Sequence, residues 1–490
     1  MRNTALSQMA DFWQRLLSSV FAQAVWILPM SHPLIVSPGF PALPIWLVEE
    51  AIWPQISAEL APIALAFAQA QDFEAKPGRL CMVPDAAGKL AGVLFGISAT
   101  DDQSADRFLI GKLPALLPEG IYRFAPAPRN PKLALLAWLL GSYVFDRYRK
   151  KQGPTAKIVA PEGVDVEEVS RIAAAVSLGR DMINTPTNDL GPDGIEDAAR
   201  ALAEKHGAKI SVMVGQDLLE QNFPMIHAVG RASATPPRLI DIRWGDENAP
   251  LVTLVGKGVA FDTGGLNIKP GSSMALMKKD MGGAAAALAT ADMVMGSKLP
   301  VRLRVLIPAV ENSISASSFR PGDILQSRKG LTVEIGNTDA EGRLILGDAL
   351  ALADEETPEL LIDFATLTGA ARVAVGPDLP PFYTDDEQLA ADIARIGMAE
   401  NDPVWRMPLW QPYASWLDSK VADINQISSQ AFAGSITAAL FLRRFVNNAK
   451  AYAHFDIYGW TPSEKPGRPA GGEVQAARLV HTLLKERYTS

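Results

Sequence analysis

Two short segments of this chain gather the acidic and basic side chains that a hydrolytic metal site needs. The first is Asn-Thr-Asp-Ala-Glu-Gly-Arg-Leu at 337–344, in which Asp339, Glu341 and Arg343 alternate with uncharged residues. In an extended chain these three side chains would leave the backbone on one side. Carboxylates held that close repel each other, and a fold tolerates them when cations lie between them.

The second segment adds acids and lysines in glycine-rich surroundings. It covers 256–270 and 277–283 and contributes Lys257, Asp262, Lys269 and Asp280. Two divalent cations would balance the four acids, and ions bridged by shared carboxylates can hold a hydroxide for attack at neutral pH. A lysine joins such a site only as a neutral amine, so one lysine is expected to have a lowered pKa. A second, charged lysine and Arg343 would face the oxyanion that forms at a carbonyl.

Other chemistries find less support in the sequence. Gly256-x-Gly258 lacks the third glycine of a dinucleotide fingerprint, and neither a Walker-type Gly-Lys-Ser/Thr nor a Gly-x-Ser-x-Gly elbow is present. The five histidines lack ligand spacing and are expected to be structural, with His454 in the core. Asp280 could instead cap the helix expected from Gly282. Lys278 and Lys279 are expected to be ordinary surface charges.

The composition is that of an ordinary globular protein and limits its partners. The chain has 490 residues, 48% hydrophobic and 20% charged, which is enough for two or three domains. Its net charge of -8 gives no general attraction for nucleic acid or an anionic membrane. No stretch reaches the ~18 apolar residues that span a bilayer. The single cysteine, Cys81, excludes an intrachain disulfide and fits a reducing compartment.

The N-terminus carries the one ambiguity in targeting. An apolar run at 16–21 precedes Ala22-Gln23-Ala24, which has the small-x-small form of a signal-peptidase site. However, acidic Asp11 lies before this run, and the apolar character continues through 25–28 as it would in a strand. We therefore expect a cytoplasmic protein.

Alternating strand and helix patterns predict an α/β protein with two domains. Residues 1–160 are expected to form a smaller N-terminal α/β domain. Its strand patterns lie at 80–83 and 91–97, and its helix patterns lie at 51–70 and 131–148. The basic, polar stretch at 147–154 marks the boundary. Residues 161–490 are expected to form a larger α/β catalytic domain with a mostly parallel central sheet.

In the larger domain the acidic segments fall next to predicted strands and helices. The strand patterns lie at 238–244, 251–255, 301–307, 360–365 and 451–458, and the helix patterns lie at 282–295, 344–353 and 435–445. Open α/β sheets place their sites just beyond such strands. The stretch at 462–472, rich in proline and glycine, is expected to be a surface loop.

These segments resemble the leucine aminopeptidases, cytosolic exopeptidases that use two metal ions. The resemblance rests on the eight residues at 337–344, on the Gly-Lys-Gly, Phe-Asp-Thr-Gly-Gly and Lys-Pro sequences within 256–270, and on Asp280 in Lys-x-Asp-Met-x-Gly. Segments 180–186, 365–370 and 433–442 are also similar. The resemblance covers roughly residues 170–490.

Carried over by position, the resemblance implies a set of metal ligands. Asp262 and Glu341 would bridge two divalent ions, zinc or manganese. Lys257 and Asp280 would complete the tighter site. Asp339 would complete the more exchangeable site through its carboxylate and its main-chain carbonyl. One ion would anchor the free α-amine of a peptide, the other would polarise its first carbonyl, and the bridging hydroxide would attack that carbonyl.

The resemblance also implies catalytic and substrate-binding residues. Lys269 would steady the tetrahedral intermediate, and Arg343 would hold a bicarbonate that acts as proton shuttle. The pocket for the first side chain would contain Met277, Thr366 and Gly369, with main-chain contacts from Leu367. The chain departs from the family at Tyr458, where a small residue is usual.

The resemblance finally implies an assembly and a cellular role. The expected protein is a cytoplasmic homohexamer, built as a dimer of trimers, that serves peptide catabolism by acting on short peptides with a free N-terminus. We expect no membrane or nucleic-acid partner. The alternative is a DNA-binding accessory protein that retains the aminopeptidase fold, since some family members act in that way; a gel shift at low and moderate salt separates the two.

Overall fold

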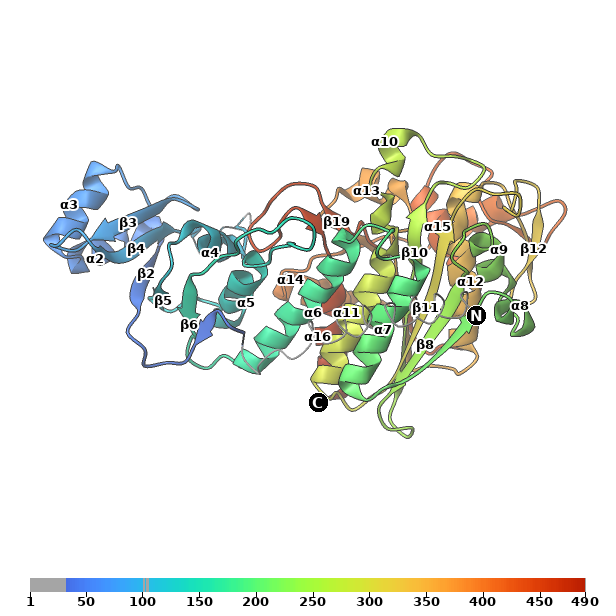
Figure 1. The fold of residues 1–490 in the computed structure, drawn as a ribbon, viewed down its shortest axis with the longest axis horizontal. Coiled ribbons are helices and arrows are strands. Elements are labelled where there is room, and N and C mark those ends of the chain that lie inside the picture. Colours follow the sequence, from blue (N-terminus) through green and yellow to red (C-terminus); the bar gives the residue numbers. More distant parts are fainter. Residues whose placement is uncertain (1–31, 100–101, 103–104, 490) are drawn as a thin grey trace, which may run out of the picture.

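The computed structural model describes residues 32–99, 102 and 105–489, which fold into two α/β units (Figure 1). The signal-like segment at 16–24 lies outside the described residues. The first unit is built on a six-stranded sheet with the order β1-β6-β5-β2-β4-β3. Its strands are β1 (Ile35–Val36), β2 (Leu43–Val48), β3 (Leu80–Pro84), β4 (Leu90–Gly96), β5 (Ile121–Ala125) and β6 (Lys157–Val159). Only the β3–β4 pair is antiparallel.

Short helices cover this first sheet. They are α2 (Trp53–Glu59), α3 (Pro62–Ala70), α4 (Leu113–Leu116) and α5 (Pro131–Gly141). Helix α5 begins where the Asn130 side chain accepts a hydrogen bond from the Leu133 N–H, and Pro131 suits its first turn. The predicted continuation of this helix to 148 is wrong. Gly141 passes too close to Gly111 for a side chain, and the chain beyond it is irregular, with the Tyr143 hydroxyl bonded to Asp181.

The second unit contains a nine-stranded, mostly parallel sheet, as the sequence predicts. Its main order is β16-β15-β18-β14-β9-β11-β8-β7, and β10 pairs with β11. The strands are β7 (Lys209–Val214), β8 (Arg238–Trp244), β9 (Leu251–Gly256), β10 (Gly258–Asp262), β11 (Arg302–Asn312), β14 (Leu360–Ala365), β15 (Pro381–Tyr383), β16 (Trp405–Arg406) and β18 (Tyr452–Asp456). The antiparallel pairs are β7–β8, β8–β11 and β15–β18. Strand β18 ends before Tyr458, which therefore lies in the following loop.

Two layers of helices cover the faces of this sheet (Figure 1). One layer contains α6 (Val166–Asn184), α7 (Pro192–His206), α11 (Gly282–Gly296), α14 (Glu387–Ala399) and α16 (Ala477–Tyr488). The other contains α8 (Asp217–Glu220), α9 (Pro224–Gly230), α12 (Glu341–Asp354) and α15 (Gly434–Arg443). Every residue of α11 before Gly296 is buried, and its alanines let it lie directly against β9 and β14. Among the described residues, no helix has the length and apolar character to cross a bilayer.

Smaller elements complete the second unit. They are β12 (Ile324–Gln326), β13 (Thr332–Glu334), β17 (Ile424–Asn425), β19 (Trp460–Thr461), β20 (Gly471–Gly472), α10 (Gly271–Met274) and α13 (Gly369–Val375). The expected surface loop at 462–472 is only partly a surface loop. Gly467 and both residues of β20 are buried, and β20 pairs with β19. The reason is Arg180, which is fully buried and donates hydrogen bonds to the Gly467 carbonyl and to Glu473.

Candidate metal centre

The predicted charged residues meet at the carboxyl ends of neighbouring strands. Lys257 follows β9, Asp262 ends β10, and Thr366 follows β14. Asp280 lies in a short 3-10 helix, Met277–Met281, that leads into α11, and Glu341 is the first residue of α12. The crossover connections of a parallel sheet therefore bring together residues that are more than 100 positions apart in the sequence.

Lys257 lies among the buried acids. Its Nζ is 2.7 Å from Asp280 Oδ2 and 3.2 Å from Glu341 Oε1, and it donates to the Thr366 carbonyl at 2.9 Å. The main chain fixes its position, because the Lys257 N–H donates to the Phe364 carbonyl and its own carbonyl accepts from Ala284 N–H. Both Lys257 and Asp280 are almost completely buried. Asp280 does not cap α11, which has no side-chain cap.

The second lysine joins the remaining acid to this group. Lys269 Nζ lies 2.9 Å from Asp262 Oδ2 and 2.5 Å from Asp339 Oδ1. Asp339 is half-buried, whereas Asp262 is 2% exposed. The two lysines thus occupy different sides of the cluster, and only Lys269 contacts its more open part.

The segment at 337–344 is helical rather than extended. Thr338–Ala340 forms a 3-10 turn whose start is fixed by the Asn337 side chain, which accepts a hydrogen bond from Asp339 N–H. Helix α12 begins directly afterwards, at Glu341. The prediction that an extended chain places Asp339, Glu341 and Arg343 on one side is therefore wrong. A tight turn and the first turn of a helix follow each other there, and of the three residues only Glu341 joins the buried acids directly.

Burial and mutual repulsion shift the pKa values of these groups. Burial, and then the charges of Asp262 and Asp280, raise the pKa of Glu341 to about 8. Burial is also the main cause that raises the pKa of Asp339. For Lys257, burial acts to lower the pKa, but the surrounding carboxylates outweigh it and raise the pKa above its usual value. The expected lowered pKa therefore does not arise among the protein groups alone, because the ammonium is itself a counter-ion of the acids.

Two glycines allow Lys257 to lie close to α12 and allow α11 to lie close to the end of β14. A Cβ on Gly342 would lie 2.3 Å from Lys257 Cε, and a Cβ on Gly283 would lie 2.1 Å from the Phe364 carbonyl oxygen. Contacts under 3.0 Å are not found for real Cβ atoms. Any larger residue at 342 would push Lys257 away from the acids.

The donor set fits divalent cations. Asp262, Asp280 and Glu341 each offer a carboxylate oxygen, and these three oxygens lie within 4.8 Å of one another. All three residues are buried, where unbalanced carboxylates are costly. Asp339 lies outside this triad and reaches it through Lys269. Oxygen-rich sites of this kind bind hard and borderline divalent ions.

Three further polar residues hold this site, and the sequence did not indicate them. The buried Asn312 amide donates to Asp262 Oδ1 at 2.8 Å and to the Thr338 carbonyl at 3.0 Å. The main-chain carbonyl of Gln426 accepts a hydrogen bond from Arg343 Nη1, and the Gln426 side-chain amide donates to the Ala340 carbonyl. Asp456 accepts hydrogen bonds from the N–H groups of Leu367 and Thr368. Asn312 and Asp456 are the last residues of β11 and β18, and this position is the one signal that could have identified them as part of the site.

Arg343 lies apart from the lysines. It is 8% exposed, its Nη1 donates to the Gln426 carbonyl at 2.8 Å, and its Nε has no hydrogen-bond partner among the described residues. Burial lowers the pKa of Arg343 to about 10. At neutral pH the guanidinium is therefore a charged donor with unused capacity, as an anion such as bicarbonate would require.

Of the residues expected to contact substrate, Thr366 is bonded directly to Asp280. The Thr366 hydroxyl donates to Asp280 Oδ1 at 2.9 Å, and Leu367 follows with a main chain held by Asp456. Met277 begins the 3-10 helix that carries Asp280, and the exposed Gly369 begins α13.

The expectation that Lys278 and Lys279 are ordinary surface charges is wrong. Lys278 is partly buried and donates to the Asn184 carbonyl at 2.7 Å. Lys279 is only 5% exposed, and burial lowers its pKa to about 8. Tyr458 is half-buried beside it, with Lys279 Nζ 5.1 Å from the ring centroid. Lys279 is therefore buried, and Lys278 is held by a main-chain acceptor.

The histidines are structural where the structure pairs them. His454 is fully buried and bonded to Asp363 at 2.7 Å, as predicted. His206 pairs with Asp292 at 2.6 Å, and His481 with Ser297 at 3.0 Å. Among the described residues, the one group of candidate metal ligands is the triad of Asp262, Asp280 and Glu341.

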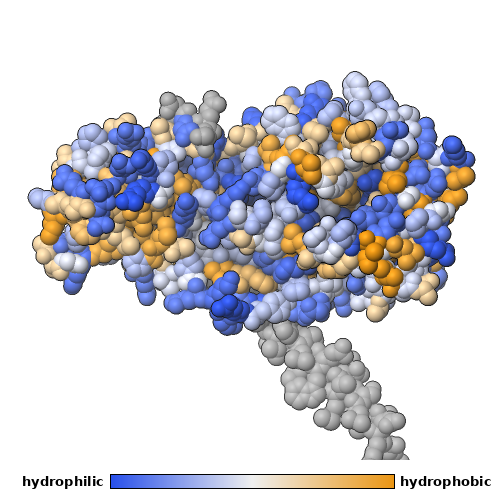
Figure 2. Space-filling model, turned by 90° about the horizontal axis from the view of Figure 1, so that it is seen from above, coloured by the Kyte–Doolittle hydropathy of each residue, from blue (hydrophilic) through white to orange (hydrophobic). Residues whose placement is uncertain are grey.

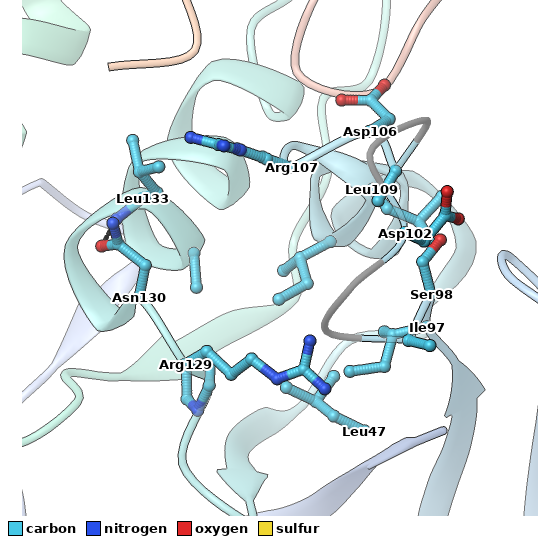
Figure 3. Close-up of a pocket in the computed structure, with 15 residues that line it drawn as sticks. Leu47, Ile97, Ser98, Asp102, Asp106, Arg107, Leu109, Arg129, Asn130 and Leu133 are labelled. Atoms are coloured by element: carbon cyan, nitrogen blue, oxygen red, sulfur yellow. Dashed lines mark hydrogen bonds between the residues drawn. The ribbon is translucent and has the colours of Figure 1, made fainter. Parts of the chain in front are cut away.

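A separate cavity lies in the first unit, far from this triad in the sequence. It has a volume of about 350 Å³ and opens beyond the carboxyl ends of β2, β4 and β5 (Figure 3). Arg107 and Arg129 border it on opposite sides (Figure 3). Both arginines have protein partners, the Met398 carbonyl and Glu49 respectively. On the face of the molecule seen in Figure 2, the surface of both units mixes hydrophilic and hydrophobic residues.

Comparison with known families matches both units. Residues 177–484 match the catalytic domain of the cytosol aminopeptidase family, and residues 43–161 match the M17 aminopeptidase N-terminal domain. Among curated relatives, a probable cytosol aminopeptidase of Syntrophotalea carbinolica is 40% identical over 71% of this chain and 73% of its own. One of Chlorobium limicola is 34% identical over 85% of this chain and 91% of its own.

Solved structures agree with these matches. The cytosol aminopeptidase of Coxiella burnetii superposes with a TM-score of 0.89 and 44% identity, covering 93% of this chain and all of the other. The bottromycin maturation enzyme BotP in complex with Mn gives a TM-score of 0.83 and 31% identity, covering 91% of this chain and 99% of the other. With its fold, its acidic cluster and both family domains in agreement, the chain belongs to the cytosol aminopeptidase family of metal-dependent aminopeptidases.

Proposed function

We propose that this protein removes single amino acids from the free N-terminus of short peptides and uses two divalent cations, zinc or manganese. The observation that carries the proposal is the convergence of three buried carboxylates and Lys257 within one small volume. Lys257, Asp262, Asp280, Asp339 and Glu341 would hold the ions. When bound, such ions would supply Lewis acidity at the scissile carbonyl and lower the pKa of a bound water.

Each protein group then has a distinct task. Asp280 would attract the positively charged α-amine of the substrate, because its carboxylate lies beside the expected pocket and is held by Thr366. Lys269, still charged, would donate to the oxyanion that forms at the carbonyl. Arg343 would hold a bicarbonate and thereby help to move a proton to the departing amine. Its unpartnered Nε supports this role.

Substrate orientation would come from the residues beside Asp280. Met277, Thr366 and Gly369 would surround the first side chain, and the main chain of Leu367 would hold the peptide. This main chain is fixed from behind, since Asp456 accepts hydrogen bonds from two successive N–H groups. Recognition of the amine places the cut after the first residue, which disfavours internal cleavage.

The domain boundary, assembly and location follow from family membership by analogy. The first domain would comprise residues 1–160 and the catalytic domain residues 161–490. The protein would act in the cytoplasm, in peptide catabolism, as a homohexamer with contacts from the N-terminal domain. Light scattering under active conditions should give six times the 52.6 kDa of one chain. The mass of a single chain would contradict this assembly.

The two lysines should differ when each is replaced by methionine, which keeps most of the volume and removes the charge. Lys257→Met should lower metal occupancy, because Lys257 lies between Asp280 and Glu341. Lys269→Met should keep most of the metal and slow turnover by roughly 100-fold, the scale of losing an oxyanion donor. Elemental analysis and kcat on a leucyl amide measure the two effects. Equal loss of metal in both variants would show that the roles are wrongly divided.

A free α-amine should be essential for cleavage. N-acetylation removes a positive charge and a metal-binding nitrogen together, so hydrolysis of an acetylated leucyl amide should fall by several orders of magnitude. A long peptide blocked at its N-terminus serves as the control for internal cleavage. Comparable rates for the free and acetylated amides, or internal cuts in the blocked peptide, would rule out an aminopeptidase.

A further inference from the structure

Lys279 is a buried cation that the proposed chemistry does not use. Its side chain follows a different course from that of Lys278, whose ammonium is bonded to the Asn184 carbonyl. No hydrogen bond or ion pair joins the Lys279 ammonium to another residue in the described part of the chain, although the residue is 95% buried (5% exposed). An ammonium in largely buried surroundings without a protein acceptor is poorly satisfied, so its donors are suited to a group that arrives from outside.

An aromatic ring and a second cation accompany it. Lys279 Nζ lies 5.1 Å and Arg372 Cζ 4.8 Å from the centroid of the Tyr458 ring. The main chain of Tyr458 is fixed, because the Gln475 side chain accepts hydrogen bonds from the N–H groups of Tyr458 and Gly459. Arg372 is exposed and has no side-chain hydrogen bond or ion pair with another described residue. The ring therefore holds two cations that lack a paired anion.

This three-residue cluster of Lys279, Tyr458 and Arg372 lies beside the reaction site. Lys279 directly precedes Asp280, and Arg372 lies one turn along α13 from Gly369. A Cβ on Gly459 would lie 3.0 Å from Thr366 Cγ2 and 3.7 Å from the Lys279 carbonyl oxygen. Lys279 thus adjoins the metal-site residue Asp280, while Tyr458 and Arg372 lie close in the chain to contacts of Thr366 and to Gly369, which are expected to surround the first side chain of the substrate.

We propose that this cluster recognises the first side chain and selects peptides that begin with aspartate or glutamate. The inference rests on the proposed aminopeptidase function and adds the substrate class. A carboxylate at the end of the side chain would accept hydrogen bonds from the Lys279 ammonium and be attracted by Arg372. The same charges repel lysine and arginine side chains, and the neutral amides glutamine and asparagine lack the charge that the cluster complements.

The test compares aminoacyl coumarin amides, which carry no C-terminal carboxylate, on the metal-loaded enzyme. The wild type should show a kcat/KM for the glutamyl or aspartyl amide about 10-fold or more above that of its glutaminyl or asparaginyl counterpart, the scale of one charge-assisted hydrogen bond. The lysyl amide should be the poorest substrate. A wild-type preference for the neutral amides would overturn the inference without the need for any variant.

Variants assign the preference to the cluster. Lys279→Met should bring the ratio of acidic to neutral substrate close to one, and Arg372→Met, on an exposed helix face, should lower it by a smaller factor. Lys278→Met is the matched control, since the neighbouring lysine is bonded elsewhere, and the ratio should stay unchanged. Tyr458→Phe keeps the ring and should keep the ratio. A wild-type ratio that survives Lys279→Met would contradict the assignment.

Further outcomes distinguish failure of the proposed selectivity from failure of the proposed aminopeptidase function. Cleavage of leucyl and alanyl amides without a preference for acidic ones would refute only the selectivity. Absence of cleavage for every aminoacyl amide would remove the proposed function and the inference with it. If Lys279→Met instead impaired the dipeptide leucyl-alanine but not its C-terminal amide, the cluster would bind the peptide carboxylate, and recognition of the first side chain would be wrong.

Discussion

Repulsion among buried carboxylates is the constraint on which the rest of this structure depends. Three acids place oxygens within 4.8 Å of one another, and at an effective dielectric constant of about 20 each pair of charges repels by about 3 kcal/mol. Three such pairs approach the whole stability of a typical domain, which is about 5 to 15 kcal/mol. Without positive charge among them, these acids do not all stay ionised, since burial and repulsion raise the pKa of Glu341 to about 8. Lys257 and Lys269 provide part of that charge, and divalent cations provide the rest in the proposed enzyme.

The architecture supplies the geometry that this balance requires. Parallel strands end at one edge, so Lys257, Asp262 and Thr366 meet without long loops. Glycines at 283 and 342 let α11 and α12 approach closely enough for Lys257 to reach Asp280 and Glu341. Behind the acids, neutral amides complete the arrangement: Asn312 and Gln426 donate hydrogen bonds without adding charge. The site is therefore rigid for electrostatic reasons as well as for reasons of packing.

Much of this could be predicted from the sequence, because the charged residues lie in two contiguous segments whose composition is unusual. The mostly parallel sheet was also predictable from alternating apolar patterns. The edge strands β7 and β16, and β15 next to β16, were missed. Strand β11 was predicted to end at 307, so Asn312 at its true end was missed too. Such residues become neighbours of the acids only through the strand order, which local patterns do not encode.

Local patterns also misassigned residues whose neighbours are distant. Lys278 and Lys279 are identical in type and adjacent, yet one bonds to α6 and the other lies over Tyr458. The spacing of Asp339, Glu341 and Arg343 indicated an extended chain, whereas the Asn337 cap starts a helical turn. The helix expected to reach 148 ends at Gly141, where close contact with Gly111 leaves no space for a side chain. For the lysines and for the helix at 131–148 a tertiary contact outweighed the local preference, whereas at 337–344 the local cap of Asn337 did so.

The metal content of the purified, active chain tests the central claim most directly. Elemental analysis of the wild type should find two divalent ions per chain, and Glu341→Gln should lose most of both, because Glu341 is one of the three buried acids whose oxygens converge. The thermal midpoint of the wild type should fall when a chelator removes the ions and the carboxylates are left uncompensated. Full activity in a chain shown to be free of metal, or unchanged metal content in Glu341→Gln, would contradict the account.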